Sequence, residues 1–107
     1  MAYDEGLAER VRPLLAHRDD VREQKMFGGI AFMVGDKMCV GITNNDLMVR
    51  LSASDYEVAL KRPHARPMDF TGRPMRGFVY VAPEGIKNKR QLQAWIDLAL
   101  AYRATLG

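Results

Sequence analysis

MFGGIAFMVGDKMCVGI, residues 26–42, is the stretch that decides the fold of this 107-residue chain. Residues 30–34 are apolar without interruption, which is typical of a β-strand covered on both faces. Gly35-Asp36 predicts a hairpin turn, and the return strand runs over residues 37–42. Gly28-Gly29 predicts a bend or a close backbone approach at the entrance to this hairpin.

More strands are expected on either side of the hairpin. Residues 21–27 alternate poorly and are mostly polar, which favours an edge strand or an irregular lead-in. Asn44-Asn45 marks a turn, because asparagine tolerates positive φ, and residues 47–51 follow as a further strand. Residues 64–82 return to extended structure, most clearly over residues 75–82.

Helical periodicity appears at the two ends of the chain and once between strands. Residues 3–16 predict a helix that Pro13 either kinks or divides into two pieces. The run Ser54-Asp55-Tyr56-Glu57 has the spacing of a capping box and opens a short helix to about Lys61. Asn88 is expected to cap a last helix that continues to about Thr105. The apolar stripe of that helix comprises Leu92, Trp95, Ile96, Ala99 and Tyr102.

The order of elements predicts the fold class. One helix, three or four strands, a short helix, two strands and a last helix indicate a single α+β domain over residues 1–107. It should have two layers, with an antiparallel sheet and helices on one face. The second face of the strand at 30–34 also needs cover, from a helix or from another subunit. Met33 and Met48 are the candidate interface residues on that less certain face, although core packing explains most of the seven methionines.

Composition bounds the class of protein. A hydrophobic fraction of 48% and a charged fraction of 27% are ordinary for a globular domain. No apolar run approaches the roughly 20 residues of a membrane span. The acidic N-terminus lacks the pattern of a signal peptide, so a cytoplasmic location is expected. Cys39 is the only cysteine, which excludes an internal disulfide and a cysteine-rich metal site.

Charge is distributed unevenly along the chain. Residues 1–60 carry a net charge of −3, residues 61–90 carry +6, and residues 91–107 are neutral. A basic third of a small domain can attract a phosphate backbone or an acidic protein, whereas scattered cations on a solvated surface are the simpler interpretation. The candidate nucleic-acid contacts in this basic segment are Arg62, Arg66, Arg73, Arg76, Lys87, Lys89 and Arg90.

No catalytic constellation emerges from the residue types. Gly28-Gly29 lacks the phosphate-binding fingerprint and a following helix. Cys39 lies in the middle of a strand and is best interpreted as a buried, inert thiol. His17 is assigned to a helix end and His64 to a loop, without the spacing of a metal site. We therefore expect a protein that is not an enzyme and that has no metal and no cofactor.

The motif Met-Phe-Gly-Gly-x-x-Phe, formed by Met26, Phe27, Gly28, Gly29 and Phe32, resembles the N-terminal domain of the TfoX (Sxy) family. The resemblance extends through residues 47–51, residues 67–70 with 75–81, and the Trp95 helix, and so covers nearly the whole chain. It implies an α/β two-layer fold similar to secretion-chaperone-like domains, and it supplies no catalytic residues. Full-length members of the family add a C-terminal helical domain. The 107 residues of this chain match only the N-terminal domain, so a stand-alone N-terminal domain is expected.

The resemblance and the residues leave two main hypotheses of function. TfoX proteins regulate DNA uptake and competence genes in bacteria and resemble coactivators, which implies a small interaction domain that acts through protein contacts, as a homodimer or with a protein partner. The alternative is a nucleic-acid-binding accessory protein that uses the basic segment 61–90. An unrecognised enzyme is a third hypothesis, which a strongly perturbed Cys39 or His64 in a cleft would favour.

Overall fold

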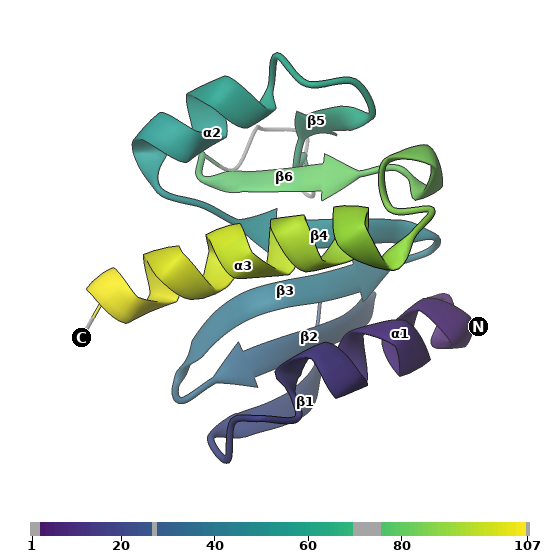
Figure 1. Ribbon diagram of the computed structural model, residues 1–107, viewed down its shortest axis with the longest axis vertical. Coiled ribbons are helices and arrows are strands. Elements are labelled where there is room, and N and C mark those ends of the chain that lie inside the picture. Colours follow the sequence, from purple (N-terminus) through teal and green to yellow (C-terminus); the bar gives the residue numbers. More distant parts are fainter. Residues whose placement is uncertain (1–2, 27, 70–75, 107) are drawn as a thin grey trace.

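Figure 1 shows the computed structural model of the protein, which describes residues 3–26, 28–69 and 76–106. Six strands of the described residues form one antiparallel sheet in the order β1-β2-β3-β4-β6-β5. The strands are β1 (Val21–Met26), β2 (Gly29–Val34), β3 (Lys37–Thr43), β4 (Asp46–Arg50), β5 (Ala65–Pro67) and β6 (Phe78–Val81). The α-helices are α1 (Glu5–Leu15), α2 (Ala53–Ala59) and α3 (Lys89–Thr105), and a 3₁₀ turn, η1, spans Pro83–Gly85.

The first four strands form a meander, and single residues with positive φ allow its tight turns. Gly35 has φ +66° in the β2–β3 turn and Asn44 has φ 54° in the β3–β4 turn, both in the left-handed region that these residue types tolerate. Gly29 lies so close to β3 that a Cβ there would overlap the carbonyl oxygen of Ile42. The close approach predicted at the glycine pair is therefore confirmed at Gly29, while Gly28 supplies the turn with φ +72°.

All three α-helices pack on the same face of the sheet. Figure 1 shows α3 crossing the middle of the sheet, with α1 over β1 and β2 and α2 beside β6. Phe32, Val40 and Val49 point from the strands into this core, where they meet Val11 of α1 and Trp95 of α3. Trp95 is 2% exposed and anchors the apolar stripe of α3. The two-layer α+β class, the antiparallel sheet and the helices on one face are confirmed.

The opposite face of the sheet carries a second, smaller apolar cluster. Its buried members are Ala31, Met33, Met38, Met48 and Met68, and Met26, Phe78 and Tyr80 pack at its margin. The second face of the strand at 30–34 is thus buried within one chain, but no described helix covers it, so the expectation of a helix on this face is wrong.

Several local predictions need correction. The second helix is capped by Ser52, whose hydroxyl accepts from the Asp55 N–H at 3.2 Å, so the capping box expected at Ser54 is wrong. The side chain that precedes the first helical residue is Ser52, since the helix begins at Ala53. Pro13 neither divides nor ends α1, because it lies in the last turn and forfeits only one helical hydrogen bond.

The other end of the chain matches the expectation in more detail. Asn88 caps α3 by accepting from the Gln91 N–H at 2.9 Å, and the Gln91 side chain accepts from the Asn88 N–H at 3.2 Å. The extended segment 64–82 resolves into the short strand β5 and the longer β6. Phe27 of the glycine motif lies outside the described residues.

Candidate interaction surfaces

The two methionines proposed as interface residues lie in the second apolar cluster. Met33 is 7% exposed and Met48 is 0% exposed. Met48 faces Gly41 across β3 and β4, where its Cε lies 2.6 Å from the position that a Cβ of Gly41 would take. Both side chains therefore pack inside one chain, and a contact with a second subunit through them stays a prediction.

At the β5 side of the same face, an arginine and a tyrosine form a half-exposed pair. The Arg66 guanidinium lies 4.9 Å from the centroid of the Tyr80 ring and donates to an Asp46 carboxylate oxygen at 2.6 Å. A hollow of about 490 Å³ opens beside them, lined by Arg66, Pro67, Asp69 and Tyr80. Burial raises the pKa of Tyr80 above its ordinary value, while the neighbouring Arg66 lowers it. Because Arg66 and Asp46 form an ion pair, the positive charge of Arg66 is neutralised locally.

Arg62 lies on the other face of the molecule. Its guanidinium sits 4.4 Å from the centroid of the Trp95 ring, on the helix side of the sheet. Arg66 is in register with Tyr80, whose side chain packs against the second cluster on the opposite side. Arg62 and Arg66, four residues apart in the sequence, therefore do not share a surface.

The remaining residues of the basic segment fall into separate groups. Arg76 lies 3.5 Å from the Glu57 carboxylate, and both side chains are largely exposed. Lys87, Lys89 and Arg90 are exposed around the start of α3 and make no ion pair within the described part of the chain. Arg73 lies outside the described residues. The structure thus brings Lys87, Lys89 and Arg90 together and separates them from Arg66.

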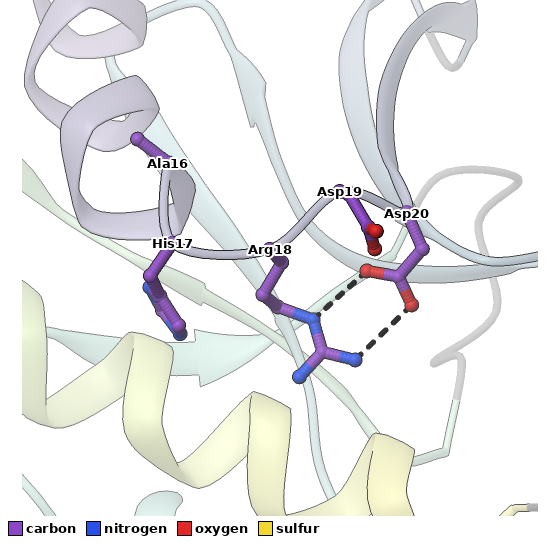
Figure 2. Close-up of a pocket in the computed structure, with 5 residues that line it drawn as sticks. All are labelled: Ala16, His17, Arg18, Asp19 and Asp20. Atoms are coloured by element: carbon purple, nitrogen blue, oxygen red, sulfur yellow. Dashed lines mark hydrogen bonds and ion pairs between the residues drawn. The ribbon is translucent and has the colours of Figure 1, made fainter.

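The loop between α1 and β1 forms an open depression of about 360 Å³, lined by residues 16–20. Figure 2 shows the Arg18 guanidinium and the Asp20 carboxylate side by side, joined by two hydrogen bonds of 3.0 and 3.1 Å. This pairing lowers the pKa of Asp20 and raises that of Arg18. Because cation and anion neutralise each other, the depression offers no net charge to a ligand from this pair.

Arg103 ties the end of α3 to the β2–β3 hairpin. Its Nε donates to the Val34 carbonyl at 2.7 Å, and a terminal nitrogen lies 3.6 Å from the Asp36 carboxylate. A Cβ on Gly35 would lie 2.8 Å from the same guanidinium, so glycine leaves room for it. The sequence pattern did not single out Arg103, because its partners are about 70 residues away in the chain. Only its position at the end of the apolar stripe, four residues after Ala99, could have suggested a role.

The remaining residue types do not assemble a reactive centre in the described ranges. Cys39 is 1% exposed, which confirms its predicted burial, and this burial raises the pKa of its thiol to about 12. His17 and His64 are exposed. Within residues 3–26, 28–69 and 76–106 no three histidine, cysteine or carboxylate side chains gather as a metal site. No helix in the same ranges is both long and apolar enough to cross a membrane.

Sequence comparison places this chain in a family of regulatory-type domains. The TfoX N-terminal domain family matches residues 13–102, which span the sheet and most of the helical layer. The chain therefore belongs to the TfoX N-terminal domain family. None of the curated proteins matches it.

Proposed function

We propose that this domain is a non-enzymatic interaction module in bacterial gene regulation. It acts through protein contacts on the transcription of competence genes or of other genes. Membership of the TfoX N-terminal domain family is the observation that carries the proposal. The active form is a homodimer in the bacterial cytoplasm.

The proposal is tested in the organism from which the chain comes. Deleting the gene should change the abundance of a defined set of transcripts, with DNA-uptake genes the first to inspect, and expression of the wild-type chain should restore them. Expression of a chain that does not fold serves as the control. A deletion strain whose transcripts match those of its parent would refute the regulatory role.

Nucleic-acid binding is the second candidate function, and one observation favours it. Lys87, Lys89 and Arg90 form an exposed basic group without acidic partners among the described residues. Counterion release would make binding to duplex DNA fall with salt, with a slope near −0.9 per phosphate contact. Arg66 lies on the opposite face and is paired with Asp46, so it provides a matched control.

Fluorescence anisotropy with labelled duplex DNA and single-stranded RNA, at low and physiological salt, separates the two functions. A basic-group contact predicts that replacing Lys87, Lys89 and Arg90 by glutamine flattens the salt dependence, while Arg66→Gln leaves it unchanged. Absence of binding at either salt concentration would reject this candidate and leave the protein-contact function standing.

A further inference from the structure

The outer strand β1 is the one long sheet edge that the described residues leave open. It has six residues, and residues 22–25 are exposed. The opposite edge, β5, has three residues and includes Pro67, which has no N–H to donate. Unpaired backbone groups on an edge strand are a template for another strand. The β1 edge therefore offers more unpaired backbone groups to another strand than the β5 edge does.

The register of the sheet identifies which backbone groups of β1 point outward. The Gly35 N–H donates to the Asp20 carbonyl at 2.8 Å, and Val21 is opposite Val34. Hydrogen-bonded and non-hydrogen-bonded pairs alternate along an antiparallel ladder, so Arg22 and Gln24 bond to β2. The N–H and C=O groups of Val21, Glu23 and Lys25 therefore face away from the sheet.

The side chains of β1 form a self-complementary charge pattern. Glu23 and Lys25 lie on the helix face, where Glu23 receives two hydrogen bonds from Arg12 at 2.8 and 2.9 Å. The Arg12 contact lowers the pKa of Glu23, which keeps its carboxylate charged. Lys25 is exposed and makes no ion pair within the described ranges. One strand thus presents a carboxylate that Arg12 already pairs but that can accept a further donor, and an exposed lysine two residues further on.

We propose that two copies of this chain pair antiparallel through β1, with the two-fold axis at Gln24. Glu23 of each copy then lies opposite Lys25 of the other, in hydrogen-bonded positions, and Gln24 lies opposite Gln24. The neighbouring two-fold registers place like charges directly opposite, as Glu23 with Glu23, Lys25 with Lys25 or Arg22 with Arg22. Such an isologous contact joins the two sheets into one continuous sheet.

This contact specifies the dimer of the proposed function, yet it is tested on purified protein and fails independently of any transcript result. Light scattering over a dilution series should show a concentration-dependent dimer. Lys25→Glu places glutamate opposite Glu23 at two symmetric positions and should weaken the dimer about tenfold or more. Adding Glu23→Lys together with Arg12→Glu, which keeps an opposite charge beside position 23, exchanges the charges and should restore the dimer. A wild-type chain that stays monomeric, or a dimer that Lys25→Glu leaves unchanged, would overturn the proposal.

Disulfide trapping checks the register itself. Opposed residues in a non-hydrogen-bonded antiparallel pair have Cα atoms about 4.5 Å apart, which a disulfide can bridge. Gln24→Cys should therefore form a covalent dimer on oxidation with copper phenanthroline. Arg22→Cys, on the same strand and face, should not, and wild type should stay unlinked because Cys39 is buried. Linkage at position 22 in preference to position 24 would reject the Gln24-centred register.

Discussion

Two adjacent glycines illustrate how much a single residue can decide in this protein. Gly28 needs its positive φ, but a Cβ there would meet nothing within 4 Å. Gly29 has no positive φ, yet a Cβ there would overlap the carbonyl oxygen of Ile42 on the neighbouring strand. Glycine is thus required at these two positions for different physical reasons. The reason at Gly29 depends on how close the neighbouring strand lies, and the sequence does not give that distance.

Alanine at each glycine should separate these reasons. We expect Gly29→Ala to cost about 3 kcal/mol or more, because β2 and β3 must move apart. Gly28→Ala should cost only about 1 kcal/mol, from left-handed strain, and Gly28→Asn still less. Urea unfolding followed by circular dichroism measures both free energies. Equal costs at the two positions would contradict the close approach at Gly29.

The Cys39 thiol gives a pH dependence with a definite sign. Its pKa is raised by burial to about 12 in the folded chain, whereas an unfolded thiol has a pKa of about 8.5. Above pH 9 the unfolded state therefore releases a proton that the native state retains, and alkaline pH favours unfolding. The Cys39 contribution to stability is complete below about pH 8 and falls by about 1.4 kcal/mol per pH unit towards pH 12.

The measurement is a comparison of wild type with Cys39→Ala, because other groups that titrate in alkali then cancel. The difference in free energy of unfolding between the wild-type chain and Cys39→Ala should shift against the wild type between pH 9 and pH 11. Parallel stability curves over that range would mean that the thiol ionises as readily in the folded state as in the unfolded state.

At the scale of elements, hydrophobic periodicity predicted most of the fold. The hairpin of residues 26–42, the strand at 47–51 and the last helix depend on local alternation and caps, which a sequence displays directly. The cap of α2 was misplaced because Ser52 and Ser54 both precede carboxylates at suitable spacing. Only the backbone shows which serine precedes the first helical residue.

Two serine variants test that assignment. Ser52→Ala should destabilise the protein by about 1 kcal/mol, because the Asp55 N–H loses its acceptor. Ser54→Ala should stay within about 0.5 kcal/mol, since that side chain is exposed. Thermal unfolding distinguishes them, and a larger effect at Ser54 would restore the sequence-based assignment.

Arg103 shows why long-range polar contacts escape sequence reasoning. Replacing Arg103 by alanine removes a charged donor to the Val34 carbonyl, and we expect a loss of about 2 kcal/mol. Asp36→Asn removes only the longer ion-pair contact with an 80% exposed side chain and should cost less than about 0.5 kcal/mol. Similar losses in both variants, measured by urea unfolding, would assign the stabilisation to the surface ion pair instead.

At the scale of the whole molecule, the sheet has an apolar cluster on each face. Sequence alone predicted that the second face needs cover, but it left open whether a helix or another subunit supplies that cover. The candidate cations show the same difficulty, since Arg62 and Arg66 are near in sequence and lie on opposite faces. Which residues share a surface is a property of tertiary structure, so the basic segment could be predicted as a composition but not as a surface.

Met48 measures the contribution of the second cluster. It is fully buried, so Met48→Ala should cost about 2–4 kcal/mol through lost burial and a residual cavity. Met26→Ala, at the half-buried margin of the same cluster, should cost clearly less. Denaturant titration compares the two, and a negligible loss at Met48 would show that this face contributes little to stability.

The position of α3 has a consequence for synthesis on the ribosome. The strands β1 to β4 are consecutive in the chain and can pair as soon as residue 50 has left the exit tunnel. The helix-side residues of β3 and β4 nevertheless stay exposed to water until α3 emerges, because Leu92, Trp95 and Ile96 supply much of the cover over these two strands. A nascent chain stalled before residue 89 would hence expose an apolar sheet and recruit chaperones, whereas release of residue 105 would allow one late, cooperative closure.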